Sequence, residues 1–338
     1  MNRIEFGDCR DTMRRWAADG VKAQTCVTSP PYFGLRDYGH DGQIGLEQTP
    51  DEYIKVMVEV FRCVWDVLAD DGTLWLNIGD SYNNFRSQMG PGQAVHGRDK
   101  LNGKPDVNSK KRGVDGLKEK DLIGIPWMLA FALRADGWYL RQDIIWHKPN
   151  PMPESVQDRC TKAHEYIFLM SKSQKYYYNS EAIAIPLAET SNARLAQPNL
   201  ANQTGSDRVP GKTNGNMKAV GPRFGGNKYG DDDRAESRTK SGNEWTGDTG
   251  KANRRSVWTV ATKPYSGAHF AVFPSDLIEP CILAGAPVGG IVLDPFMGSG
   301  TTAQVAQNLG RKYLGCELNP DYCQLQNIRT AQQSLELA

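Results

Sequence analysis

Several features that would assign a protein to a class at once are missing from this sequence of 338 residues. There is no run of ~18 apolar residues, so a membrane-spanning helix is not expected. Residues 1–16 hold acids and arginines instead of an apolar segment, so a secretory signal is not expected either. The seven cysteines form no CxxC pair, and the five histidines show neither HExxH nor HxH spacing. We therefore expect reduced thiols, a cytoplasmic location and no catalytic metal.

Apolar residues are scarce as well, at 39% of the chain, whereas glycine is abundant with 34 residues. The usual apolar share is ~45–50%, so a globular core with long polar loops is expected, and collagen, coiled coil and full disorder are excluded. The net charge of +1 is unevenly distributed, because 82–120 and 190–256 each carry +5 and the remainder carries −9. Both segments have the composition of loops. They are either solvated insertions or a cationic surface for a polyanion such as nucleic acid.

Elsewhere the apolar pattern alternates between strands and helices. Strands are expected at 22–27, 73–78, 138–146, 166–170, 290–293 and 312–316, and helices at 51–68, 126–135, 276–285, 301–309 and from Pro320. A further short strand is expected before Gly7. This alternation predicts an α/β fold around a mostly parallel sheet.

A glycine-rich turn follows one of these strands. The segment 292–302 runs from an apolar strand through Gly298-Ser299-Gly300 into a helix, and the next strand ends at Glu317. Glycines let a backbone approach a ligand, and a carboxylate on the next strand accepts hydrogen bonds from ribose hydroxyls. The GxxxxGK[ST] spacing of a phosphate-binding loop is absent. A nucleotide-type cofactor site is favoured over a plain strand-to-helix turn.

A second loop, Ser29-Pro30-Pro31-Tyr32, follows the strand at 22–27. Two prolines stiffen it at the carboxyl end of a strand, which is where open α/β sheets bind ligands. Ser29 and the Pro30 carbonyl offer acceptors, and Tyr32 offers a flat ring. Taken alone the loop is also compatible with a plain turn.

Together the two loops resemble the beta class of S-adenosylmethionine-dependent DNA amino-methyltransferases, in which an SPPY or DPPY motif precedes an FxGxG motif. Further stretches that fit are Gly7-Asp8-Cys9, Trp146 with Lys148-Pro149-Asn150, His164-Glu165-Tyr166, and His269-Phe270 through Phe273-Pro274. The resemblance implies a Rossmann-like methyltransferase fold. It divides the chain into a catalytic half (1–81 and 121–188), a basic insertion (82–120), a target-recognition region (189–256) and a cofactor-binding half (257–338).

The resemblance also implies residue roles. The catalytic residues would be Ser29, Pro30, Pro31 and Tyr32. S-adenosylmethionine would be bound by Asp8, Phe270, Pro274, Asp294, Phe296, Gly298, Ser299, Gly300, Thr301 and Glu317. Contacts with duplex DNA would come from Arg36, Lys148, Arg159, His164, Lys251, Arg254 and Arg255. Each group also has a structural alternative. Asp8 is equally compatible with a helix N-cap. Phe270 and Pro274 are also compatible with core packing, and the basic residues are also compatible with surface ion pairs.

In this family the target base leaves the helix, since its amino group is unreachable while paired. Tyr32 would stack on that base, and Ser29 with the Pro30 carbonyl would aim the amine. Serine at position 29 resembles cytosine-N4 enzymes more than adenine-N6 enzymes.

Cytosine-C5 methylation is dismissed, because Cys281 stands in a helical apolar pattern. A protein that binds the cofactor without turnover, and an enzyme acting on RNA or a small molecule, remain alternatives. A cognate restriction endonuclease is a further implied partner.

Overall fold

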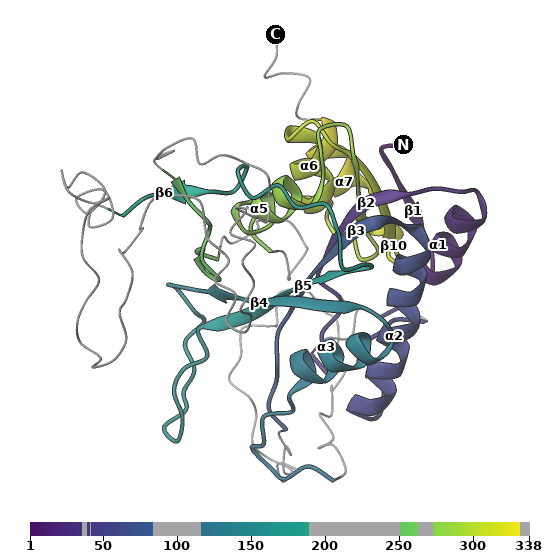
Figure 1. Ribbon diagram of the computed structural model, residues 1–338. Coiled ribbons are helices and arrows are strands. Elements are labelled where there is room, and N and C mark those ends of the chain that lie inside the picture. Colours follow the sequence, from purple (N-terminus) through teal and green to yellow (C-terminus); the bar gives the residue numbers. More distant parts are fainter. Residues whose placement is uncertain (36–38, 41, 84–115, 189–250, 263–272, 332–338) are drawn as a thin grey trace, which may run out of the picture. The chain divides into compact units, whose positions relative to one another are not determined.

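The computed structural model describes residues 1–35, 39–40, 42–83, 116–188, 251–262 and 273–331 (Figure 1). The chain divides into two compact units, Met1–Ala182 with Arg255–Ala338 and Ile183–Arg254. Arg36 and Phe270 lie outside the described residues, as does most of each basic segment. The roles expected for them, and the division into functional halves, stay predictions.

The larger unit contains one sheet with the strand order β1-β10-β9-β2-β3-β5-β4-β8. The strands are β1 (Arg3–Phe6), β2 (Ala23–Thr28), β3 (Leu68–Ile78), β4 (Tyr139–His147), β5 (His164–Ser171), β8 (Val257–Thr259), β9 (Ile291–Asp294) and β10 (Lys312–Glu317). All neighbours pair in parallel except β3 with β5 and β4 with β5. The expected mostly parallel sheet is therefore confirmed. In the smaller unit, β6 (Ile185–Pro186) pairs antiparallel with β7 (Lys251–Ala252).

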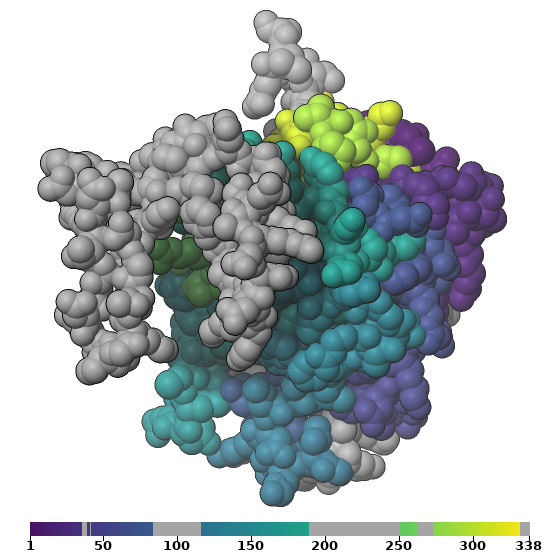
Figure 2. Space-filling model, viewed as in Figure 1, coloured from purple at the N-terminus to yellow at the C-terminus, as the bar shows by residue number. Residues whose placement is uncertain are grey.

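Helices cover both faces of the large sheet. They are α1 (Cys9–Ala18), α2 (Pro50–Val67), α3 (Ile125–Ala135), α5 (Ser275–Gly285), α6 (Thr301–Asn308) and α7 (Cys323–Ala331), with a 3₁₀ turn at Pro320–Tyr322 before α7. Helix α2 contacts α1 and α3, and α6 contacts α5 and α7 (Figure 1). The pairing of β1 with β10 also places the first strand beside a strand from the last third of the chain, and Figure 2 shows the purple and yellow segments side by side.

Alternating side chains of β3 explain why helices pack against both faces of the large sheet. Leu74 and Leu76 belong to the buried cluster that α1, α2 and α3 complete. Trp75 and Thr73 face the opposite way, because a Cβ built at Gly285 of α5 would lie 2.8 Å from Trp75 Nε1 and 3.0 Å from Thr73 Oγ1. A period of two places alternate residues on opposite faces of a strand. A strand that is apolar on both faces must be covered on both.

Helix α2 begins one residue before the predicted helix and ends one residue before its predicted end. The Thr49 side chain accepts from the Glu52 N–H, and Glu52 reaches back to the Thr49 N–H, which forms a capping box. The strand expected at 73–78 begins earlier than predicted, because β3 starts at Leu68 and includes the polar residues Asp70 and Asp71. Leu68 already pairs with Ala23, and the register shifts before Thr25, so the strand absorbs the polar residues as an irregularity.

Two features are absent from the described ranges. No described helix has the length and apolar character needed to cross a membrane. Within the same ranges, no three His, Cys, Asp or Glu side chains are grouped so that they could hold a metal ion.

Candidate active site

One cavity of about 690 Å³ lies where the carboxyl ends of the parallel strands meet. The loops that follow β1, β2, β4, β9 and β10 all contribute residues to its lining. Strand β5 runs the opposite way, so its amino end reaches the same edge. In open α/β sheets, ligands bind in the crevice outside the carboxyl ends of the strands.

The glycine-rich loop forms one wall of this cavity. Gly298 and Gly300 have φ values of 54° and 90°, a region that favours glycine, and Gly300 is the N-cap of α6. Glu317 holds the loop, since its carboxylate accepts from the Gly298 N–H at 2.7 Å and from the Asn319 N–H at 2.9 Å. Burial raises the pKa of Glu317. Ser299 Oγ is buried beside it and has no hydrogen-bond partner among the described residues.

Asp294 fixes the start of this loop. Its carboxylate accepts from Thr28 Oγ1 and Thr302 Oγ1 at 2.6 Å each, and from the Phe296 N–H at 3.0 Å. The side chain is almost completely buried, and burial raises the pKa of Asp294 to about 6. Its carboxylate therefore joins the end of β2, the glycine-rich loop and α6, although the residue also borders the cavity.

Most of the other residues expected to bind the cofactor border the same cavity, but Gly300, the N-cap of α6, is not among the residues that line it. Phe296, Gly298, Ser299, Thr301, Glu317 and Asp8 line it. Asp8 is the N-cap of α1, where its side chain accepts from the Arg10 N–H at 2.8 Å. It also borders the cavity, and its contact with the cofactor stays a prediction. The hydrogen bond from the Arg10 side chain lowers the pKa of Asp8. Pro274 is the buried N-cap of α5 and does not appear in the lining, whereas its neighbour Phe273 does.

The proline-rich loop forms the opposite wall. Ser29, Pro30, Pro31 and Tyr32 all line the cavity. Tyr53 of α2 donates its hydroxyl to the Pro31 carbonyl at 2.9 Å, which ties the loop to the core. The two prolines fix φ, so the loop is held without a ligand.

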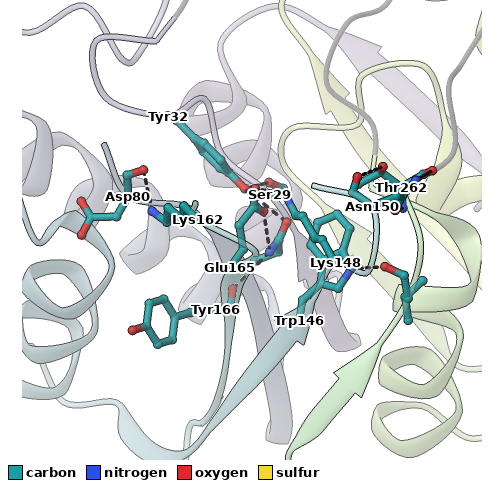
Figure 3. Close-up of polar contacts among 12 residues, drawn as sticks. Ser29, Tyr32, Asp80, Trp146, Lys148, Asn150, Lys162, Glu165, Tyr166 and Thr262 are labelled. Carbon is teal, nitrogen blue, oxygen red and sulfur yellow. Dashed lines mark hydrogen bonds and ion pairs between the residues drawn. The ribbon is translucent and has the colours of Figure 1, made fainter. Parts of the chain in front are cut away.

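Tyr32 makes the contacts that connect this loop to the middle of the sheet. Its hydroxyl donates to Glu165 Oε2 at 2.8 Å and lies 3.4 Å from Ser29 Oγ (Figure 3). Burial and, secondarily, the charge of Glu165 raise the pKa of the Tyr32 hydroxyl. Only glycine fits at position 79 beneath the ring, because a Cβ there would lie 2.7 Å from Tyr32 Cε2.

Glu165 is the residue whose role sequence reasoning missed. It forms an ion pair with Lys148, in which the two side chains are only 18% and 16% exposed, and both line the cavity. The ammonium of Lys148 also lies 4.2 Å from the centroid of the Trp146 ring. The antiparallel register of β4 and β5 pairs Trp146 with Glu165 and so brings the acid and the lysine together. The only local signal was an acid at the start of an apolar strand.

A family model described as DNA methylase, of the N6/N4 type, matches residues 23–328. The chain belongs to this N6/N4 DNA methylase family. The match confirms the resemblance found in the sequence and makes the chain a DNA methyltransferase. It leaves open which exocyclic amine is methylated, since the family includes both specificities.

Full-length relatives support the same assignment. The chain is 43% identical over 327 residues to the type II methyltransferase M.SmaI of Serratia marcescens, covering 97% of this chain and 90% of that protein. It is also 43% identical over 316 residues to the type II methyltransferase M.Cfr9I of Citrobacter freundii, covering 94% and 83%.

Solved structures with the same fold are more distant in sequence. The PvuII DNA methyltransferase, described as cytosine-N4-specific, has a TM-score of 0.56 at 16% identity, covering 97% of this chain and 85% of that one. M1.HpyAVI, solved as a complex with S-adenosylmethionine, has a TM-score of 0.51 at 17% identity, covering 97% and 100%. These neighbours confirm the Rossmann-like methyltransferase fold.

The basic residues that the methylase resemblance assigned to DNA occupy different places. Lys148 lines the cavity, but His164 and Arg159 do not. Arg159 pairs with Glu154 at 2.5 Å and lies over the Tyr82 ring at 3.9 Å. His164 packs edge-on against Tyr166, and burial lowers its pKa.

Three further basic residues lie near the boundary of the two units. Lys251 is exposed on β7, Arg254 is the last residue of the smaller unit, and Arg255 is exposed just before β8. Their contacts with DNA stay predictions.

Proposed function

We propose that this chain methylates the exocyclic N4 amine of cytosine at specific sites in duplex DNA, with S-adenosylmethionine as the methyl donor. One observation carries the proposal: the proline-rich loop and the glycine-rich loop open onto the same cavity. A base and a nucleoside cofactor held on these two walls would face each other.

The residues of the glycine-rich wall fit S-adenosylmethionine. Glu317 uses its carboxylate oxygens for one backbone N–H each and retains acceptor capacity for ribose hydroxyls. Ser299 Oγ is a buried polar atom for which the described residues supply no partner, and a bound ligand would supply one. When bound, S-adenosylmethionine supplies a methyl group that is already activated on a sulfonium centre.

The proline-rich wall orients the amine. Ser29 Oγ and the Pro30 carbonyl accept hydrogen bonds from the two amine hydrogens, so the nitrogen lone pair is directed across the cavity. Tyr32 stacks on the extruded base, which returns ~1–3 kcal/mol of the unstacking cost. Orientation of this kind can contribute ~7–11 kcal/mol to lowering a barrier. No covalent intermediate on the protein is needed.

Two features favour cytosine. Ser29 occupies the position at which the resemblance places Asp or Asn in adenine-N6 enzymes. Lys148 adds an ammonium donor to the cavity, and the Watson–Crick edge of cytosine carries two adjacent acceptors, N3 and O2, whereas that of adenine carries only N1. Methylation of adenine N6 is the alternative outcome.

Transfer of labelled methyl groups tests the proposal. Mixed-sequence duplex DNA should take up label from S-adenosylmethionine, and an equal mass of duplex RNA should compete poorly. Nucleoside mass spectrometry of the digested DNA then separates N4-methyldeoxycytidine from N6-methyldeoxyadenosine. Cofactor binding without transfer would point to a sensor, and preferential labelling of RNA would replace the substrate class. We further infer a cytoplasmic location and a cognate restriction endonuclease, because the closely related methyltransferases carry type II names.

A further inference from the structure

The rim of the cavity carries two exposed apolar side chains. Met152 is 86% exposed and Leu35 is 45% exposed, and both line the cavity. Single exposed apolar residues are common on protein surfaces. Met152 differs from most of them, because it lies at the mouth of the active site on a loop that is held in place at several points.

The segment 148–153 is anchored from its first residue. The Lys148 N–H donates to the Ala163 carbonyl at 2.8 Å. Asn150 pairs with Thr262 through two hydrogen bonds, donating to its carbonyl at 3.1 Å and accepting from its N–H at 2.9 Å (Figure 3). Prolines on both sides of Met152 fix their own φ angles and restrict the residue before each of them. The backbone angles at Met152 are therefore restricted, and the segment is anchored at Lys148 and Asn150.

An exposed apolar side chain on a restricted backbone, beside a pocket for a base, suits contact with duplex DNA. When a base leaves a duplex, the neighbouring base pairs lose their stacking contacts on one side. Proteins that distort DNA insert Met, Leu, Ile, Phe or Pro side chains between base steps. Methionine suits such a gap, because it is unbranched and its thioether is polarizable.

We propose that Met152 enters the base stack at the position that the target base vacates, and that segment 150–153 is a DNA-contacting surface. This inference rests on the proposed function, since it presupposes that a base is extruded from duplex DNA into the cavity. Leu35 borders the same mouth, but it directly follows the catalytic loop and has no proline on either side. Met152, which lies between two prolines, is therefore the side chain assigned to the base stack.

The test compares two DNA substrates. Both contain the sequence that sequencing of methylated plasmid DNA identifies as the chain's site. In one duplex the target base is paired, and in the other it lies opposite an abasic position, so that it is already unpaired. Met152→Ala should lower kcat/KM on the paired duplex by roughly ten- to a hundredfold, in line with the cost of unstacking one step, and by less than about threefold on the unpaired duplex.

Two control variants accompany this test. Val288→Ala removes an apolar side chain that is 77% exposed, precedes the amino end of β9 and is absent from the cavity lining, and it should alter neither rate. Met152→Leu should restore most activity on the paired duplex. S-adenosylmethionine affinity should be unchanged in every variant, which also reports that the fold is intact.

We call the insertion of Met152 into the base stack the wedge, and each outcome of the test bears on it. Equal losses on the two duplexes, or no loss on either, would overturn it while leaving the proposed methylation standing. A selective loss with Leu35→Ala instead of Met152→Ala would also overturn it. If the unaltered chain methylates neither duplex, the proposed function fails and the wedge fails with it.

Discussion

Variants of Tyr32 test directly whether this residue binds the target base or the cofactor, because the two roles predict different effects on activity and on cofactor affinity. Two variants divide its contributions: Tyr32→Phe removes only the hydroxyl, and Tyr32→Ala removes the ring as well. The hydroxyl donates to Glu165, and a hydrogen bond to a charged group contributes ~1.5–3 kcal/mol. Since Glu165 keeps its ion pair with Lys148 in either variant, the lower value applies, and Tyr32→Phe should lose about tenfold in kcat/KM.

Removal of the ring adds the loss of stacking. Base–aromatic stacking contributes ~1–3 kcal/mol, so Tyr32→Ala should lose roughly a hundredfold or more in total. S-adenosylmethionine affinity, measured by calorimetry, should be unchanged in both variants. Tyr139→Phe is the matched control, because Tyr139 is exposed at the start of β4 and does not line the cavity. Loss of cofactor affinity in step with activity, or equal losses for Phe and Ala, would refute the stacking role.

Three further outcomes are expected. Glu317→Ala should weaken S-adenosylmethionine binding by about ten- to a hundredfold, because ribose hydroxyls lose a charged acceptor, and unchanged affinity in calorimetry would remove Glu317 from the site. Burial raises the pKa of Asp294 from the ordinary 3.8 to about 6 in the folded protein. Between about pH 4 and pH 6 the folded state therefore keeps a proton that the unfolded state has released. The free energy of unfolding falls as the pH rises through that window, by up to about 3 kcal/mol. Asp294→Asn should flatten this fall in denaturant titrations, and an unaltered slope would contradict the assignment. Replacing Lys251, Arg254 and Arg255 by Ala should reduce the salt slope of DNA binding by up to ~3 if all three contact phosphates, whereas isotherms matching wild type at every salt concentration would show that none does.

Much of the fold could be predicted because its signals are local. The helical spacing from Ile54 to Leu68 follows a Pro at the start of α2, and the Thr49–Glu52 capping box is readable as a T-x-x-E pattern. The glycine-rich loop was placed for the same reason, since strand, turn and helix follow one another within a dozen residues. The pairing of strands, in contrast, depends on residues that are far apart in the sequence. Nothing in the sequence near β5 indicates that it runs antiparallel to both of its neighbours.

That reversal explains what was missed at the site. Glu165 reaches the cavity because the amino end of β5 lies beside the carboxyl end of β4, and its ion pair with Lys148 spans seventeen positions of the chain. For Asp294 the family resemblance implies a contact with the cofactor, and it gives no indication of the residue's hydrogen bonds within the fold. Its partner Thr28 lies 266 residues earlier, and only the pairing of β2 with β9 brings the two side chains into contact.

The central claim is that an exocyclic amine held at Ser29–Tyr32 receives the methyl group. The most direct measurement is nucleoside mass spectrometry of duplex DNA after incubation with S-adenosylmethionine that carries a trideuterated methyl group, with the Ser29→Ala variant in parallel. The expected result is N4-methyldeoxycytidine that carries the deuterium label, formed by the wild-type chain and strongly reduced in the Ser29→Ala variant. Label on carbon 5 of cytosine, or no labelled nucleoside at all, would contradict it.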